Sequence, residues 1–196
     1  MGFLSVLSFA RQLVSQRLQA GDTAVDATVG TGADTLFLAE TCGRKGRVFG
    51  FDIQAEALSL AEQRLAKAME AGAARLAPVA LLRRSHAEMA AALPAEVHGR
   101  IGAVMFNLGY LPAENADKAV ITQPDSTLAA LNAAVELLRP RGILAAVVYP
   151  GHEGGSAEAE LVEAWAKEIP PALGQTVIYR QLQRSSAPYL IAFEKK

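Results

Sequence analysis

The chain has 196 residues, of which 51% are hydrophobic and 20% charged, and its formal net charge is -1. That length suits a single domain with a full core, so we expect one domain over residues 1–196. The balance of 19 basic and 20 acidic residues excludes a protein that coats nucleic acid through bulk positive charge, and the single cysteine excludes an intramolecular disulfide and a cysteine-based metal cluster.

The N-terminal stretch MGFLSVLSFARQLV predicts an amphipathic helix over residues 3–19, whose apolar face carries Phe3, Val6, Leu7, Ala10, Leu13 and Val14. The stretch lacks the basic start and the cleavage pattern of a signal peptide, and its apolar run is too short to cross a bilayer. We therefore expect a cytoplasmic protein without a membrane partner, which also fits the lone cysteine.

Short apolar runs alternate with helical patterns along the rest of the chain. Strands are predicted at 23–28, 47–52, 79–84, 101–107 and 142–149. Helices are predicted at 33–42, 54–71, 86–93, 124–139 and 156–168. Two further strands, at 175–182 and 188–195, indicate an antiparallel hairpin. The pattern predicts an α/β fold with a Rossmann-like, doubly wound, mostly parallel seven-stranded sheet that ends in this hairpin.

A glycine-rich turn between two carboxylates follows the first predicted strand. Asp26 ends that strand, and the next helix begins close to Asp34. The turn between them consists of Gly30, Thr31 and Gly32. A carboxylate beside a phosphate would repel it, so this turn favours a ligand that is neutral or cationic at this point.

Asp52 ends the second predicted strand, twenty residues after Gly32. An acidic residue at this place typically binds the two hydroxyls of an adenosine ribose, in NAD enzymes and in S-adenosylmethionine (SAM) methyltransferases. NAD favours a third glycine where this chain has Thr35, whereas the sulfonium and ammonium of SAM suit Asp34. The pattern therefore favours SAM; the alternative is a plain strand-to-helix turn in which Asp34 only stabilises a helix N-terminus.

Three more polar residues follow predicted strands on the same side of the sheet. Gln54 is expected to bind the ribose or the adenine, unless it is simply the first exposed residue of the next helix. Ser85 and His86 follow the third strand and are expected on the adenine side of the pocket, with His86 as a pocket residue and not a base. The three histidines of the chain are scattered and predict no metal site.

The fourth predicted strand leads into the long irregular stretch 108–123, and loops of that length in a compact domain are usually functional. In FNLGYLP, the amide oxygen of Asn107 can accept a hydrogen bond from a neutral amine, and the ring of Tyr110 can stack on a flat substrate. The alternative is a polar strand end with Tyr110 packed on the surface. His152, in YPGHEGG, is expected to contact the substrate or take a proton from the amine, or else to cap the helix at 156–168.

The motifs DATVGTGADT, FDIQ, SHAEM, NLGYLP, YPGHEGG and PYLIAFEK together resemble the bacterial class I SAM-dependent tRNA wobble-uridine methyltransferases, formerly described as rRNA methylases. The resemblance implies methylation of the 5-aminomethyl group of wobble 2-thiouridine in tRNA, which gives the methylaminomethyl product. It places cofactor contacts on Thr31, Asp34, Asp52, Gln54, Ser85 and His86. We expect Asp26, Gly30, Gly32 and Asn107 to contact the cofactor as well. The family has an asparagine where this chain has Thr31, a histidine where it has Ala33, and more asparagine and proline in the last hairpin turn, here QRSSAP.

Binding of one anticodon stem-loop needs only a few phosphate contacts, which several arginines would supply if they share a face: Arg83, Arg84, Arg139, Arg141, Arg180 and Arg184. An unpaired base would stack on Tyr110, Tyr149 or Tyr189. The expected partner is thus a tRNA anticodon stem-loop, and a homodimer stays open. Two other functions also stay open: a SAM methyltransferase of a small-molecule amine or of rRNA, and an adenosine-nucleotide binding module or nicotinamide oxidoreductase.

Overall fold

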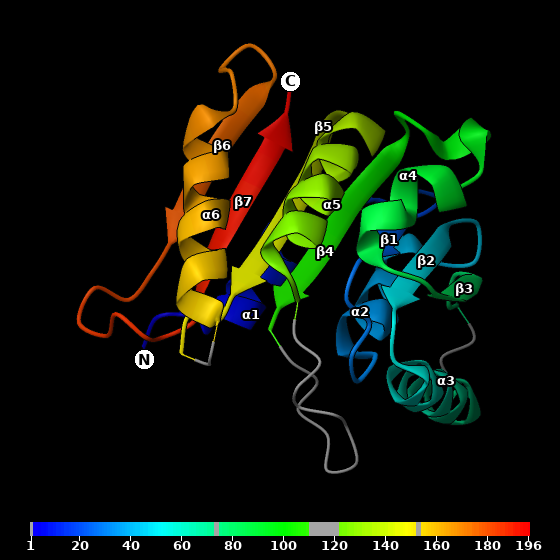
Figure 1. Cartoon of the computed structure of the whole chain (residues 1–196). Coiled ribbons are helices and arrows are strands. Elements are labelled where there is room, and N and C mark those ends of the chain that lie inside the picture. Colours follow the sequence, from blue (N-terminus) through cyan, green and yellow to red (C-terminus); the bar gives the residue numbers. More distant parts are fainter. Residues whose placement is uncertain (1, 73–74, 110–121, 152–153) are drawn as a thin grey trace.

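The structure is a computed structural model that describes residues 2–72, 75–109, 122–151 and 154–196. Within these residues seven strands form one sheet in the order β3-β2-β1-β4-β5-β7-β6 (Figure 1). The strands are β1 (Thr23–Asp26), β2 (Arg47–Asp52), β3 (Val79–Arg83), β4 (Ile101–Leu108), β5 (Leu138–Val148), β6 (Gly174–Tyr179) and β7 (Tyr189–Lys195). Strands β1 to β5 are parallel, and β7 pairs antiparallel with both β5 and β6. The predicted sheet with its C-terminal hairpin is confirmed.

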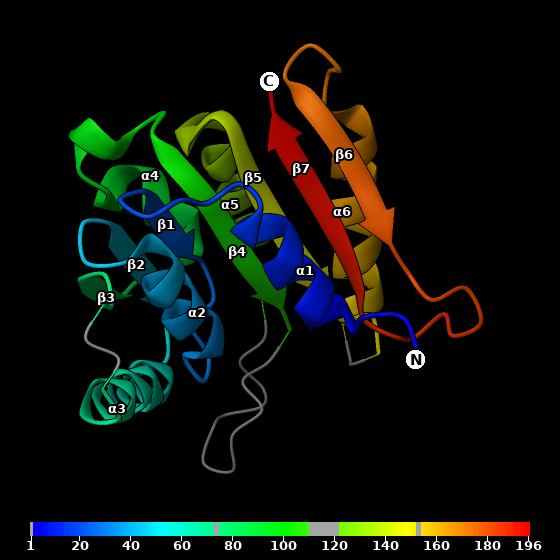
Figure 2. The same ribbon diagram turned by 180° about the vertical axis from the view of Figure 1, so that it is seen from behind.

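Helices cover both faces of the sheet (Figures 1 and 2). One face packs against α1 (Val6–Ser15) and α2 (Ala33–Cys42), with α3 (Ala55–Glu70) beside α2. The other face packs against α4 (Met89–Ala92), α5 (Pro124–Leu137) and α6 (Gly155–Glu168). Two short 3-10 helices, η1 (His86–Glu88) and η2 (Ala95–Val97), flank α4, so the helix expected at 86–93 is divided into two short elements.

The central strands are buried on both faces, which explains their continuous apolar runs. In β4, Val104 and Phe106 face the α5 and α6 side, whereas Ala103 and Met105 face the α1 and α2 side. Side chains therefore alternate between two hydrophobic clusters that the sheet separates. This sandwich holds the carboxyl ends of the strands, where the predicted site residues lie, on a rigid base.

The N-terminal helix is shorter than its apolar pattern predicts. Ser5 begins it as the N-cap, because its hydroxyl accepts a hydrogen bond from the backbone N–H of Ser8 over 3.1 Å. Phe3 lies before this cap and is 95% exposed, so its expected place on the buried face is wrong. Ala10 and Val14 do carry that face. In the part of the chain that the structure describes, no helix is long and apolar enough to span a membrane.

The strand order reverses between the adjacent strands β1 and β4. The chain leaves β1 toward β2 and β3 on one side, and it leaves β4 toward β5 on the other. β1 pairs with β2 on one side and with β4 on the other, and all three end at the same edge. Ligands of open α/β sheets bind at such a reversal of strand order, because the loops that leave the two strands diverge and leave a crevice. The site is found at this edge.

Candidate active site

A cavity of about 360 Å³ opens at the carboxyl ends of β1, β2 and β4, a volume within the usual range of small-ligand pockets. Eight of the ten predicted cofactor residues line it: Gly30, Thr31, Asp34, Asp52, Gln54, Ser85, His86 and Asn107. The two other predicted cofactor residues, Asp26 and Gly32, are not on its wall. The predicted Tyr110 and His152 lie outside the described residues.

Gly32 owes its place to packing and backbone conformation. It is the N-cap of α2 with a left-handed φ of 74°, and a Cβ atom there would lie 2.6 Å from the Cα of Ala61 in α3. Only glycine allows both the left-handed turn and this approach of the two helices. Gly32 therefore shapes the turn that forms the cavity wall, and the side-chain-free surface of the turn faces α3.

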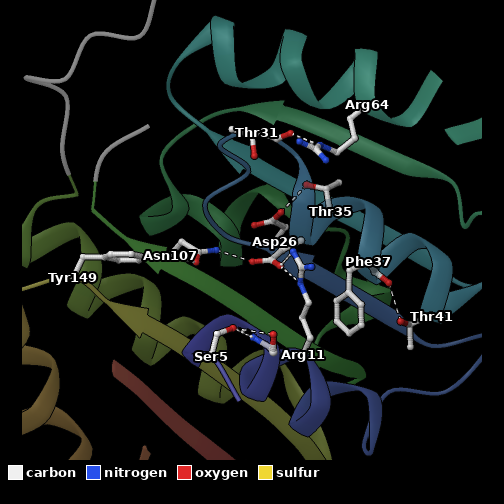
Figure 3. Close-up of polar contacts among 12 residues, drawn as sticks. Ser5, Arg11, Asp26, Thr31, Thr35, Phe37, Thr41, Arg64, Asn107 and Tyr149 are labelled. Carbon is white, nitrogen blue, oxygen red and sulfur yellow. Dashed lines mark hydrogen bonds and ion pairs between the residues drawn. The ribbon is translucent and has the colours of Figure 1, made fainter. Parts of the chain in front are cut away.

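Asp52 joins the glycine turn to the start of α3. One carboxylate oxygen accepts the backbone N–H of Gly30 over 3.0 Å, and the other accepts that of Gln54 over 2.9 Å. A carboxylate offers about four acceptor positions, so both oxygens can still accept a hydroxyl from a ligand in the cavity. Arg64 of α3 supports the same turn by donating to the carbonyl oxygen of Thr31 over 2.7 Å (Figure 3).

Asp34 is the centre of a chain of polar contacts across the cavity. Its Oδ1 atom lies 2.7 Å from both Nε and a terminal nitrogen of Arg11, and its Oδ2 atom accepts from the side-chain amide of Asn107 over 2.7 Å. The hydroxyl of Tyr149 lies 3.5 Å from Oδ1 of Asn107 (Figure 3). This chain of contacts connects elements far apart in sequence: α1, α2, β4 and the residue that follows β5.

The orientation of Asn107 follows from this chain. An ionised carboxylate only accepts hydrogen bonds, so the amide nitrogen of Asn107 faces Asp34 and its Oδ1 atom is the acceptor on the other side. The backbone N–H of Asn107 donates to the hydroxyl of Thr28 over 2.6 Å, which fixes the strand end as well. Burial and the negative charge of Asp34 raise the pKa of Tyr149, so its hydroxyl keeps its proton at neutral pH.

Asp26 lies beneath the cavity and supports it from below. It is fully buried, and its two oxygens accept from the hydroxyl of Thr35 over 2.6 Å and from the backbone N–H of Thr28 over 3.2 Å. Burial, and then the charge of Asp34, raises the pKa of Asp26 to about 7. The sequence predicted a cofactor contact for Asp26, but in the structure this carboxyl group fastens the loop after β1 to α2.

His86 and Ser85 form the wall next to β3. The Nδ1 atom of His86 lies 3.3 Å from the carbonyl oxygen of Ala27, and its Nε2 atom is buried without a hydrogen-bond partner among the described residues. Burial lowers the pKa of His86, so the ring is neutral. Ser85 caps η1 by accepting from the N–H of Ala87, while Glu88 accepts from the N–H of Ser85.

Two residues of the site carried no signal in the sequence. Arg11 lies in the predicted N-terminal helix, and none of the sequence motifs includes it. Glu158 of α6 is only 2% exposed, and its oxygens accept from the hydroxyls of Thr122 and Thr127, each over 2.6 Å. Because Thr122 is on the cavity wall, Glu158 holds that part of the wall in place. A carboxylate on a helix usually faces solvent, so nothing in the sequence pointed to its burial.

The six arginines expected to bind RNA do not share one face. Arg139 and Arg141 are at the amino end of β5, roughly 25 Å along the strand from Tyr149 at the cavity, and Arg139 pairs with Asp22 over 2.9 Å. Arg84 is on the cavity wall, and Arg83 ends β3 beside it. Arg180 follows β6 at the cavity end of the sheet and lies 3.2 Å from Glu163. Arg184 is exposed in the connection between β6 and β7.

Tyr189 cannot stack on a base, because it is only 3% exposed and its hydroxyl donates to the carbonyl oxygen of Ala159 over 3.1 Å. Tyr149 is half-buried and on the cavity wall, so its ring remains accessible to a ligand there. The two tyrosines differ because Tyr189 begins β7 inside the hydrophobic core, whereas Tyr149 follows β5 and is only partly buried. Among the described residues no cluster of three or more His, Cys, Asp or Glu side chains is placed to hold a metal ion.

The charged and hydrogen-bonding groups of the cavity fit SAM. Asp52 offers two oxygens at one end for ribose hydroxyls, and Asp34 offers a carboxylate at the other end for a cationic group. His86 is on the cavity wall, and its buried Nε2 atom has no hydrogen-bond partner among the described residues. No phosphate group would be stabilised between two carboxylates, which disfavours a dinucleotide.

Comparisons with known proteins agree with this geometry. The family described as Putative rRNA methylase matches residues 48–194. The chloroplastic tRNA (mnm(5)s(2)U34)-methyltransferase of Arabidopsis thaliana is 38% identical over 186 residues, which cover 92% of this chain and 66% of the relative. The chain thus spans just under two thirds of that relative's length.

Solved structures extend the comparison. A putative rRNA-methylase from Clostridium thermocellum is 34% identical with a TM-score of 0.89, and the match covers 100% of both chains. A putative methyltransferase from Streptococcus mutans, solved in complex with SAH, is 29% identical with a TM-score of 0.84, again over 100% of both chains. The fold is that of the class I methyltransferases, and the cofactor of this group is SAM.

Proposed function

The chain belongs to the Putative rRNA methylase family and is a SAM-dependent methyltransferase, and from that premise we propose that it methylates the amine of 5-aminomethyl-2-thiouridine at the wobble position of tRNA. The product would be the methylaminomethyl nucleoside. The name of the Arabidopsis thaliana relative supports this substrate, because that protein is described as a methyltransferase of mnm(5)s(2)U34 in tRNA.

The observation that carries the proposal is the fixed orientation of Asn107. Asp34 holds its amide nitrogen, which leaves its Oδ1 atom as an acceptor at the cavity. A neutral amine that donates a hydrogen bond to this oxygen has its lone pair directed away from Asn107 and into the cavity. Asn107 would thereby orient the nucleophile, and such positioning supplies much of the rate of a direct displacement.

Beyond positioning the amine, the protein needs to contribute little to the transfer itself. SAM, when bound, supplies an electrophilic methyl group. The amine nitrogen forms the new N–C bond while the C–S bond breaks and its electron pair stays on sulfur, and the methylated ammonium then loses one proton. We assign the ribose hydroxyls to Asp52, the cationic end of the cofactor to Asp34, and the adenine side to Ser85 and His86.

The RNA would lie over the cavity edge of the sheet. Arg83, Arg84 and Arg184 remain as candidates for phosphate contacts, since Arg139 and Arg141 lie at the opposite end and Arg180 is paired with Glu163. The half-buried ring of Tyr149 is the candidate for base stacking. A few such contacts suffice for one stem-loop and need no overall positive charge.

Mass spectrometry of nucleosides from a strain that lacks the gene tests the proposal. We expect the methylaminomethyl nucleoside to disappear from tRNA and its aminomethyl precursor to accumulate, with rRNA nucleosides unchanged. Unchanged tRNA nucleosides together with the loss of a methylated rRNA nucleoside would assign the enzyme to rRNA instead. Unchanged tRNA and rRNA would leave the small-molecule amine as substrate.

A further inference from the structure

We propose that Arg11 binds the carboxylate of the cofactor's methionine part, so that helix α1 belongs to the cofactor site. Nothing in the sequence motifs pointed to Arg11, and it lies before residues 48–194, the part of the chain that matches the family. The inference concerns the cofactor and does not depend on which amine is methylated.

Arg11 is held at the cavity by two contacts. Its Nε atom and one terminal nitrogen both lie 2.7 Å from Oδ1 of Asp34, and its guanidinium lies 5.6 Å above the ring of Phe37 (Figure 3). The side chain of Arg11 keeps 36% of its surface exposed and lines the cavity, whereas that of Asp34 is only 6% exposed. The guanidinium is thus positioned by protein contacts without being buried by them.

Charge balance at this end of the cavity requires a cation. The methionine part of SAM carries an ammonium, which suits Asp34, and a carboxylate, which Asp34 would repel. Among the described residues that line the cavity, the permanently charged cations are Arg11 and Arg84. Arg84 directly precedes Ser85 at the β3 side, so Arg11 is the cation beside Asp34 and Asn107.

The geometry of the guanidinium lets Arg11 serve both carboxylates. Arginine has five N–H donors in a planar fork, and the contacts with Asp34 use two of its three nitrogens. Among the described residues the remaining donors have no hydrogen-bond partner, so they can form charge-assisted hydrogen bonds with a second carboxylate. The Arg11–Asp34 pair therefore presents a positive and a negative group side by side, which complements the zwitterionic end of the cofactor.

The competing explanation is that Arg11 only fastens α1 to α2. Ligands that differ in one charged group separate the two explanations, because a purely structural residue affects every ligand alike. S-adenosylhomocysteine carries both the ammonium and the carboxylate, 5′-(3-aminopropyl)thioadenosine keeps the ammonium alone, and 5′-methylthioadenosine has neither.

The experiment is calorimetric binding of these three compounds to the wild type, Arg11→Gln and Arg17→Gln. Arg17 is the matched control, since it pairs with Glu194 over 2.8 Å and does not line the cavity. We expect Arg11→Gln to weaken S-adenosylhomocysteine about 10- to 100-fold and to change the two carboxylate-free ligands less than about threefold. Arg17→Gln should leave all three affinities unchanged.

An equal loss for all three ligands in Arg11→Gln, or an equal loss for the two that carry the ammonium, would overturn the proposal. No loss for any ligand would overturn it as well. If Arg11→Gln does not fold by circular dichroism, Arg11→Lys provides the same comparison, because it keeps a cation at Asp34 but lacks the fork and should show a smaller loss confined to S-adenosylhomocysteine. No RNA enters the assay, so its outcome is independent of the proposed substrate.

Discussion

The side-chain amide of Asn107 lies 2.7 Å from Oδ2 of Asp34, so the residue near the end of β4 is oriented by a residue in the first turn of α2. The two residues belong to different functions in our proposal: Asn107 contacts the substrate and Asp34 the cofactor. A single hydrogen bond therefore couples the cofactor end of the cavity to the group that orients the amine. The variants below separate the two functions.

Asn107→Ala should reduce turnover far more than cofactor binding. The amide contact with the amine is lost, and a hydrogen bond of this kind accounts for about a 10- to 100-fold decrease in kcat. The affinity for SAM, measured by calorimetry, should change only slightly, since Asp34 keeps Arg11 as partner. A variant that methylates at the wild-type rate would remove Asn107 from the reaction.

Asp52→Ala should weaken SAM binding by roughly 2–3 kcal/mol, because a carboxylate that accepts two ribose hydroxyls is lost. The same change frees the N–H groups of Gly30 and Gln54, so a thermal melt must show that the fold is retained. Asp52→Asn, which keeps one acceptor oxygen, should bind with intermediate affinity. Calorimetry that finds wild-type affinity in both variants would place the ribose elsewhere.

Gly32→Ala should destabilise the protein more than Gly21→Ala. Both glycines have positive φ angles, 74° and 98°, so each substitution costs about 1–2 kcal/mol of backbone strain. The two differ in the space around a new Cβ atom. At Gly32 this atom would lie 2.6 Å from the Cα atom of Ala61, whereas at Gly21 it would have no atom within 4 Å. Overpacking there adds about 1–3 kcal/mol to the loss in free energy of unfolding. Equal losses in urea melts would mean that α2 and α3 are not packed closely at this turn.

The pH dependence of stability should reveal Asp26. Its pKa rises from the ordinary 3.8 to about 7 in the folded protein, chiefly through burial. A carboxyl group with a raised folded pKa stabilises the fold while it is protonated, and this contribution is lost as the pH rises from about 4 through about 7. Asp26→Asn, which keeps the shape and an acceptor for Thr28, should lack this loss.

The measurement is the difference in free energy of unfolding between wild type and Asp26→Asn, from urea melts at pH 5, 6, 7 and 8. The difference should shift in favour of the variant by a few kcal/mol across this range, since each unit of pKa shift corresponds to about 1.4 kcal/mol. A difference that is constant with pH would show that Asp26 titrates normally. Glu163 and Glu194, whose pKa values are lowered, also make stability depend on pH. Their contribution is the same in both proteins and therefore cancels in the difference.

The sequence predicted the parts of the site that depend on strand ends. Asp52 and Asn107 follow continuous apolar runs, and the carboxyl ends of parallel strands share one edge, so their proximity follows from the fold class alone. The regular spacing from Gly32 to Asp52 likewise needs no knowledge of packing. These predictions required only local pattern and topology.

The remainder depends on how helices pack, which local pattern does not contain. Arg11 reaches Asp34 because α1 crosses the sheet next to α2, and Glu158 is buried because α5 covers it. Tyr189 was a candidate for base stacking, but it is part of the core. Arg139 and Arg141 were candidates for phosphate contacts together with Arg83, but they lie at the other end of the sheet. Charges and rings near strand ends cannot be assigned to one edge until the direction of each strand is known.

Methyl transfer to a synthetic anticodon stem-loop tests the central proposal most directly. The RNA carries 5-aminomethyl-2-thiouridine at the wobble position, and matched controls carry the 5-hydroxymethyl analogue or are replaced by the free aminomethyl nucleoside. We predict one methyl group on the aminomethyl stem-loop by mass spectrometry, none on the hydroxymethyl analogue, and an apparent KM for the stem-loop that rises with salt because phosphate contacts release counterions. Equal efficiency on the free nucleoside without a salt effect, or no transfer to the stem-loop by an enzyme that binds SAM, would contradict the tRNA assignment.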